Sequence, residues 1–261
     1  MTTSKGLSFW KLLRILILLI ILASVALNVW RDKNQDWSQP IFVVLYPVNA
    51  DQSSVSQQYI QQLSANQLQG MTEYLQQQAK QYTDQPVQFY FHLGQQVQVA
   101  PPTVPATGEI LDVMTWSLKF RYYAWKHGQK FDFKPSLELF LNYYNPKDYP
   151  VLKHSTALEN GRIGIVNLFS EHESSARNKV VIAHELLHAF GATDKYDFST
   201  GQPIFPDGYA NPKQEPLYPQ TKAELMAVAI PYSAEKSEMA DGVHQTIIGP
   251  KSATEIGWVK P

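Results

Sequence analysis

One stretch carries the strongest structural signal of this chain: His184-Glu185-Leu186-Leu187-His188-Ala189-Phe190-Gly191-Ala192-Thr193-Asp194. Its apolar residues recur at helical spacing, which predicts a helix. Residues four apart project from the same face of a helix, so His184 and His188 could grip one metal ion. Glu185 lies about 100° round the helix from His184 and could face a water on that ion.

The predicted helix is apolar over roughly half of its circumference. Two neighbouring rows form this arc: Val180, Ala183, Leu187 and Phe190 in one, and Ile182, Leu186 and Ala189 in the other, with Arg177, His184, Glu185 and His188 on the opposite side. A helix with so wide an apolar arc is expected in the interior. Ionisable groups are costly there unless something satisfies them, and a metal would do so. The alternative is a buried helix whose histidines only bond to backbone carbonyls.

The end of the predicted helix extends the pattern. Gly191 suits the left-handed position that closes a helix. The turn that it permits could bring Asp194 back toward the histidines as a third ligand. H-E-x-x-H alone should occur by chance in on the order of one chain in a hundred of this length, and requiring Gly191 and Asp194 lowers that frequency more than about a hundredfold.

This stretch resembles the active-site helix of the zinc-dependent metallopeptidases called zincins. Its extension Gly191-x-x-Asp194 is similar to the metzincin pattern H-E-x-x-H-x-x-G-x-x-[H/D], in the Asp form of snapalysin-type enzymes. It also resembles the G-T-x-D motif of aspzincins, which place the Asp farther from the histidines. The resemblance implies Zn²⁺ on His184, His188 and Asp194, with Glu185 as the general base toward a zinc-activated water.

The resemblance leaves the third ligand open to two other residues. Glu224 is an alternative to Asp194, because gluzincins take a downstream Glu, and His244 is a further contender without a distinctive spacing. Met226 stands where metzincins place a methionine turn beneath the metal, although an isolated Met more often fills a core.

Two tyrosines are candidates for the surroundings of the metal. Tyr232 could resemble the tyrosine that some of these enzymes set near the metal, and Tyr196 could line the cleft because it follows Asp194 closely.

Composition narrows the class of protein. The chain has 261 residues, is 44% hydrophobic and carries a net charge of -1, without a long basic run, which disfavours nucleic-acid binding. It has no cysteine, so disulfides, thiolate zinc sites and cysteine nucleophiles are excluded, and any zinc must sit on His and carboxylate ligands.

The N-terminal region predicts a membrane segment over residues 12–30. This run is long enough to cross a bilayer as a helix, has Trp10 and Trp30 at its ends and follows Lys5, Lys11 and Arg14. These three basic residues outnumber Arg31 and Lys33, which follow the run, and so favour a cytoplasmic N-terminus over residues 1–11 and an exported remainder. A cleaved signal peptide ending near Ser24-Val25-Ala26 is the alternative. Residues 31–39 would be a tether and 40–261 the zincin-like domain.

Hydrophobic patterns predict the remaining elements. Strands are expected at 40–46, 87–93, 137–144 and 161–169, and helices at 55–82, 109–127 and 252–259. Pro47 should end the first strand, and a Ser170-x-x-Glu173 capping box or Ser174 should open the metal-site helix. In zincins the strand corresponding to 161–169 is an edge strand that pairs with substrate. In the 109–127 helix, the aromatic side chains are expected in the core.

Together these features predict an α+β, zincin-like fold. It should have a mixed, mostly parallel sheet of four or five strands, an active-site helix and an irregular C-terminal part that carries Asp194 and Met226. The function expected is a zinc endopeptidase of peptide or protein substrates, anchored in the cell membrane with its domain outside the cytoplasm, or secreted if the N-terminal segment is cleaved. The alternatives are a zincin-shaped binding module that no longer cleaves and a zinc amidase of cell-wall peptides.

Overall fold

The computed structural model describes residues 9–106 and 108–259. Its elements are, in order, α1 (Phe9–Lys33), β1 (Ile41–Asn49), α2 (Ser54–Gln61), η1 (Ala65–Leu68), α3 (Gln69–Ala79), β2 (Phe89–Leu93), α4 (Ile110–His127), β3 (Leu137–Tyr144), β4 (Thr156–Leu158), β5 (Ile163–Phe169), α5 (Ser175–Ala189), β6 (Ala223–Glu224), β7 (Ala229–Pro231), β8 (Ser237–Met239), η2 (Val243–Gln245), β9 (Thr246–Ile247) and α6 (Pro250–Glu255). Residues 1–8 of the expected cytoplasmic N-terminus, Lys5 among them, lie outside the described residues.

A five-stranded sheet of order β2-β1-β3-β5-β4 forms the centre of the fold. The first four of these strands run parallel, and β4 is antiparallel to β5. The prediction of an α+β fold with a mixed, mostly parallel sheet is therefore confirmed. The strands β1, β3 and β5 are buried on both faces, which explains their nearly continuous apolar sequences.

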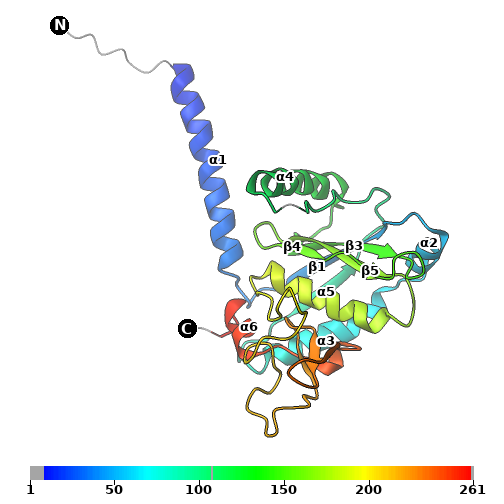
Figure 1. Ribbon diagram of the computed structural model, residues 1–261. Coiled ribbons are helices and arrows are strands. Elements are labelled where there is room, and N and C mark those ends of the chain that lie inside the picture. Colours follow the sequence, from blue (N-terminus) through cyan, green and yellow to red (C-terminus); the bar gives the residue numbers. More distant parts are fainter. Residues whose placement is uncertain (1–8, 107, 260–261) are drawn as a thin grey trace.

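Helices cover both faces of this sheet (Figure 1). α4 covers one face, where its Trp116 and Phe120 join Tyr46 and Phe140 of the strands in a smaller core. α2, α3 and α5 cover the other face and share the larger core with the C-terminal segments. α5, the helix of the predicted metal site, is thus held between the sheet and the segment that follows it.

Two expectations about the strands are wrong. β1 continues through Pro47 to Asn49, because the carbonyls of Leu45 and Pro47 point toward β2, and β2 ends opposite Leu45. The missing N–H of Pro47 therefore removes no ladder hydrogen bond. β5 is not an edge strand, because the short β4 pairs with its first half.

α5 opens at Ser174, the alternative of the two predicted caps, and not with a capping box at Ser170. The hydroxyl of Ser170 bonds to Ser56 on α2 instead of forming a capping box. The helix begins after Ser174, whose side chain bonds to Glu171 and not to a free N–H of the helix. Ser170 bonds to Ser56 in preference to capping the helix, because a buried hydroxyl needs a hydrogen-bond partner.

α4 presents its apolar residues in two directions. Trp116, Phe120 and Tyr123 are buried against the sheet, as expected for aromatic residues. Tyr122 and Trp125 instead point away from the sheet. With them lie Leu111, Met114 and Leu118, and these five side chains, the outer face of α4, are 57–77% exposed. The sheet can cover only one side of α4, and it covers the side that carries Trp116, Phe120 and Tyr123.

The two ends of the chain follow the predictions more closely. α1 has a mean hydropathy of 2.7 over its candidate membrane-spanning window, none of which is buried, so it is long and apolar enough to cross a membrane. At the other end, α6 lies earlier than the predicted 252–259 helix. Ile256 and Trp258 nevertheless dock on the core as expected.

Candidate metal centre

α5 has the two sides that its sequence predicts. Both apolar rows are buried in the larger core. His184, Glu185 and His188 emerge on the opposite side, and each offers one ligand atom within 4.8 Å of the others. Because the helix is packed along its length, the positions of these three side chains are fixed by the core beneath them.

Each imidazole is oriented by a backbone carbonyl. His184 Nδ1 lies 3.1 Å from the Leu225 carbonyl, and His188 Nδ1 lies 2.7 Å from the Ala192 carbonyl. A carbonyl only accepts, so both Nδ1 atoms carry the proton. This arrangement fixes the tautomer and leaves both Nε2 lone pairs available as ligands, as is usual for metal-bound histidine.

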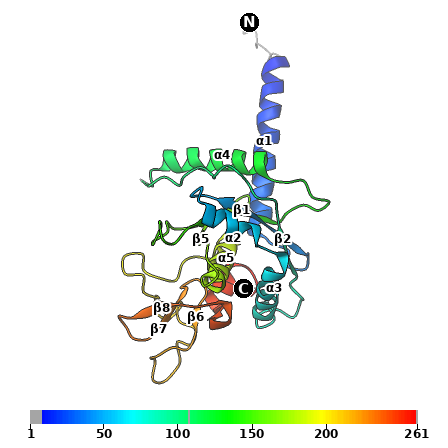
Figure 2. The same cartoon turned by 90° about the vertical axis from the view of Figure 1, so that its right-hand side faces the viewer.

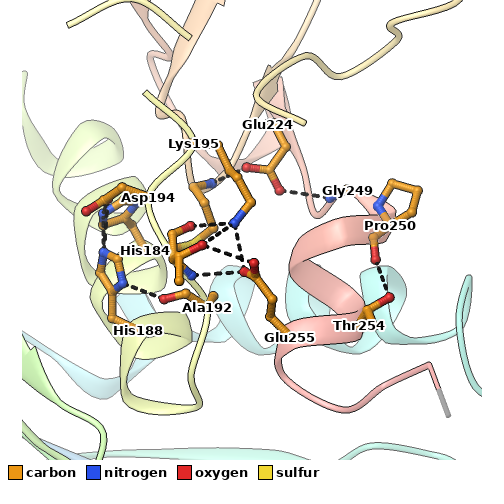
Figure 3. A network of polar contacts seen from close by, with 12 residues as sticks. His184, His188, Ala192, Asp194, Lys195, Glu224, Gly249, Pro250, Thr254 and Glu255 are labelled. Atoms are coloured by element: carbon orange, nitrogen blue, oxygen red, sulfur yellow. Dashed lines mark hydrogen bonds and ion pairs between the residues drawn. The ribbon is translucent and has the colours of Figure 1, made fainter. Parts of the chain in front are cut away.

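Asp194 completes a group of three ligand atoms (Figure 3). Its Oδ1 lies 3.2 Å from His184 Nε2 and 3.1 Å from His188 Nε2, and the two Nε2 atoms are 2.9 Å apart. Gly191 has the positive φ, +101°, that the sequence predicts for the turn that returns Asp194. The structure therefore brings together the three residues that the sequence singled out.

The arrangement fits a bound cation. Two neutral imidazoles and a carboxylate would present three lone pairs to one point, which is repulsive unless a proton or a cation lies between them. Contacts of 2.9, 3.1 and 3.2 Å are close to the ~3.3 Å that separates two ligand atoms of a tetrahedral zinc site with bonds of about 2.0 Å. Nitrogen and carboxylate oxygen are also the ligands that suit zinc.

Glu185 is the buried acid beside these ligands. Its side chain is 5% exposed, and its Oε2 has no hydrogen-bond partner among the residues that the structure describes. Burial raises the pKa of Glu185, against the lowering effect of His184 and His188. A buried acid with a free oxygen and a raised pKa is suited to accept and release a proton.

The charges of the ligands depend on one another. Burial alone would raise the pKa of Asp194. Hydrogen bonds from the Nε2 atoms of His184 and His188, which form when the imidazoles are protonated, outweigh it and hold that pKa well below its usual range. Burial alone would lower the pKa of His188. The hydrogen bond to Asp194 and the charge of Glu185 outweigh burial, so the pKa of His188 is raised. The site therefore attracts positive charge, either as protons or as a metal.

The loop that carries Asp194 is held by a polar network (Figure 3). Lys195 Nζ lies 2.7 Å from Glu255 Oε2 and donates to the Thr193 carbonyl at 2.8 Å. The Thr193 N–H donates to the same Glu255 oxygen at 2.9 Å, and the Lys195 N–H to the Met226 carbonyl at 3.0 Å. α6 thus fixes the loop that presents the third ligand, a contact that the sequence does not reveal.

The alternative third ligands lie elsewhere. Glu224 accepts hydrogen bonds from the backbone N–H groups of Met226 and Gly249 and lies apart from the histidines (Figure 3). His244 is exposed on η2. Met226 is fully buried, in the turn whose Leu225 carbonyl orients His184. This turn contributes to the site through its backbone, and a methionine-turn role stays an interpretation.

A cavity of about 610 Å³ opens beside the cluster. His184, Glu185 and Tyr196 lie along it, together with the apolar side chains Phe169, Val181, Val228 and Met239. A neighbouring hollow of about 320 Å³ also has His154 and Asn167 in its lining. The two hollows share Leu152, Lys153, His154 and Asn167 in their linings, so they adjoin and form a groove that reaches His184 and Glu185.

The structure distinguishes the candidate cleft residues. Tyr196 lies in the cavity, and burial together with the charges of Asp194 and Glu185 raises its pKa to about 12. Tyr232 lines a different hollow, beside Arg177. Sequence reasoning missed His154, which lines the groove and whose charge lowers the pKa of Glu185. A lone histidine thirty residues before His184 gives no signal of this proximity.

In comparisons with known proteins, no protein-family model and no curated protein sequence matches this chain.

Proposed function

We propose that the protein is a zinc-dependent endopeptidase anchored in the membrane by α1. The observation that carries the proposal is the convergence of His184 Nε2, His188 Nε2 and Asp194 Oδ1, with both Nδ1 atoms turned to backbone carbonyls. Three protein ligands leave a position for water, which is the arrangement of catalytic zinc sites.

His184, His188 and Asp194 would hold the zinc. When bound, zinc lowers the pKa of a water to about 7 and polarises a carbonyl. Glu185 would take the proton from that water with its free oxygen and pass it to the amine that leaves. The phenol of Tyr196 is protonated at neutral pH, and its pKa of about 12 keeps it so in alkaline solution as well, so it can donate a hydrogen bond to the substrate carbonyl oxygen as negative charge develops there.

The groove supports a peptide as the substrate. Its walls combine apolar side chains with the polar edge at Lys153, His154 and Asn167. An extended peptide could lie along it and place one apolar side chain in the 610 Å³ cavity beside Glu185. Such a groove favours cleavage within a chain over removal of a terminal residue.

The location follows from α1. Lys5, Lys11 and Arg14 lie toward the N-terminal side of the apolar run, whereas Arg31 and Lys33 lie toward the other side. This difference favours residues 34–261 outside the cytoplasm by the positive-inside rule. The end of α1 is held by the domain, since Gly161 N–H donates to Asp32 at 2.9 Å. Because the apolar run is longer than the ~7–15-residue apolar core of a usual signal peptide, we favour an uncleaved anchor over a signal peptide that is removed.

The decisive experiment compares the full chain in detergent micelles with its Glu185→Gln variant. Both are assayed for bound zinc and for cleavage of a library of unstructured peptides. We expect one zinc per chain in each, and cleavage by the wild type alone. Equal cleavage by the two proteins would exclude Glu185 as the base.

Three further variants test the ligand set. Asp194→Asn should lower the zinc content, whereas Glu224→Gln and His244→Gln should retain it. His244→Gln is the matched control, because the residue is exposed and its loss should not affect folding. Zinc loss in His244→Gln with retention in Asp194→Asn would overturn the assignment.

The same assays separate the alternatives. Stoichiometric zinc without cleavage of any peptide would favour a binding module that no longer cleaves. Hydrolysis of cell-wall peptide amides, without hydrolysis of protein-derived peptides, would favour an amidase.

A further inference from the structure

The outer face of α4 is a continuous apolar surface without a partner in the part of the chain that the structure describes. Leu111, Met114, Leu118, Tyr122 and Trp125 are all exposed and lie within an arc of about 80° of the helix, at 100° per residue. Water-exposed helices normally carry polar residues in this direction. Exposed apolar surfaces of this kind mark sites where a partner or a membrane binds.

Basic residues border this face. α4 contains three basic residues, Lys119, Arg121 and Lys126, and one acidic residue, Asp112. Lys119 and Lys126 are exposed on one flank of the apolar arc, and Arg121 lies on the other. An apolar face bordered by Lys and Arg, with Trp and Tyr among its members, is typical of a helix that lies in the plane of a membrane interface.

The structure links α4 to the end of α1. On α4, Arg121 donates to the carbonyl of Asn160. The next residue, Gly161, donates its N–H to Asp32 Oδ2 at 2.9 Å, and Arg162 donates to the Asp32 carbonyl at 2.7 Å. One turn, residues 159–162, therefore holds both the last residues of α1 and the middle of α4.

The orientation of α4 suits a bilayer that α1 crosses. In both views α1 is upright and α4 lies crosswise to it, at the level of the C-terminal half of α1 (Figures 1 and 2). α4 lies on the side of the sheet toward which α1 extends, and the outer face is turned away from the sheet. A helix across the direction of a membrane-spanning helix lies along the membrane surface.

We propose that the outer face of α4 inserts into the leaflet from which α1 emerges. The domain would then be held to the bilayer at two points, through α1 and through the apolar side chains of α4, with the exposed Lys119 and Lys126 at anionic headgroups. This contact fixes the orientation of the domain, which a tether alone would not. The proposal requires that α1 crosses the bilayer and is independent of the peptidase activity.

Spin labelling of the full chain tests this contact directly. Because the chain has no cysteine, Leu118→Cys, Leu111→Cys, Leu18→Cys and Glu235→Cys each carry a label at one position. The proteins are reconstituted in vesicles of phosphatidylcholine and phosphatidylglycerol. The collision rates of each label with oxygen, which enriches in lipid, and with a water-soluble nickel chelate are then compared.

We expect labels at 118 and 111 to favour oxygen over nickel, as the label at 18 within α1 does. The label at the exposed residue 235 of the β7–β8 segment is the matched control and should favour nickel. All four side chains replaced are exposed, so the variants should fold.

Three results would overturn the proposal. Labels at 118 and 111 that favour nickel, as at 235, would place the outer face in water. Spin–spin broadening at 118 that disappears on dilution with unlabelled protein would show a second copy of the chain as the occupant. A label at 18 that favours nickel would show that α1 does not cross the bilayer. None of these results bears on whether the zinc site cleaves peptides.

Discussion

α5 and α4 are both amphipathic helices packed on the central sheet, yet they use their apolar residues in opposite ways. α5 buries both of its apolar rows and keeps its ionisable side chains together at the edge of a cavity. α4 buries one aromatic row and turns five other apolar side chains outward. The difference shows that helical spacing predicts the helix but not which of its faces the fold covers.

The largest expected effect concerns the polar side of α5. Replacing Glu185 by Gln removes the proposed base while conserving its shape, so peptide cleavage should fall by about 10²–10⁴-fold. Zinc content should not change. The measurement is kcat/KM on one cleaved peptide, with metal analysis of the same samples; a loss of zinc together with activity would instead make Glu185 part of the binding site.

Truncating an apolar side chain should cost much more stability on α5 than on the outer face of α4. Leu186 on α5 is fully buried, so Leu186→Ala should lower the free energy of unfolding by about 2–5 kcal/mol. Leu118→Ala on the outer face of α4 should change it by less than about 0.5 kcal/mol in detergent. Denaturant unfolding of the two full-length variants checks this contrast. Equal costs would mean that the outer face of α4 is covered by protein.

Metal removal should affect the surroundings of α5. If zinc binds only the folded chain, a free concentration of about 100 times Kd stabilises it by about 2.7 kcal/mol. Chelation should therefore lower the Tm, and readdition of zinc should restore it. The His184→Ala variant, which lacks a ligand, serves as the control and should be insensitive to chelator.

The pH at which zinc leaves follows from the pKa shifts. The pKa of Asp194 is held below its usual range, so this carboxylate stays ionised as the pH falls. The pKa of His188 is raised, so protons begin to compete with the metal for this imidazole at a pH above its usual pKa of about 6.5. Zinc should therefore be released as the pH drops through the imidazole range. Retention of zinc down to the carboxylate range would contradict the histidine ligands.

The smallest effect on catalysis is expected at Tyr196, which lines the cavity beside α5. Tyr196→Phe removes one hydrogen bond worth about 1 kcal/mol, so kcat should fall by roughly fivefold with little change in KM. Tyr232→Phe, in a separate hollow, should leave both constants unchanged and is the control. A change in KM alone would indicate that Tyr196 contacts the bound substrate only.

The site itself was largely predictable because its parts are local. His184, Glu185 and His188 share one helix, and Gly191 and Asp194 follow within a single turn, so spacing alone places them together. Helical geometry holds wherever the helix packs. The strands were predictable for a similar reason, since their apolar runs identify segments buried on both faces.

The remaining features depend on contacts between distant parts of the chain. The Leu225 carbonyl that orients His184, the clamp of Glu255 on Lys195 and the approach of His154 to Glu185 join segments between 31 and 60 residues apart. No local pattern encodes such contacts, because each depends on how the loops close over the sheet. The direction in which α4 turns its apolar side chains is decided in the same way. The sequence by itself determined that α4 is an apolar helix; the tertiary structure decided that half of it faces outward, because the sheet offers only one surface to cover it.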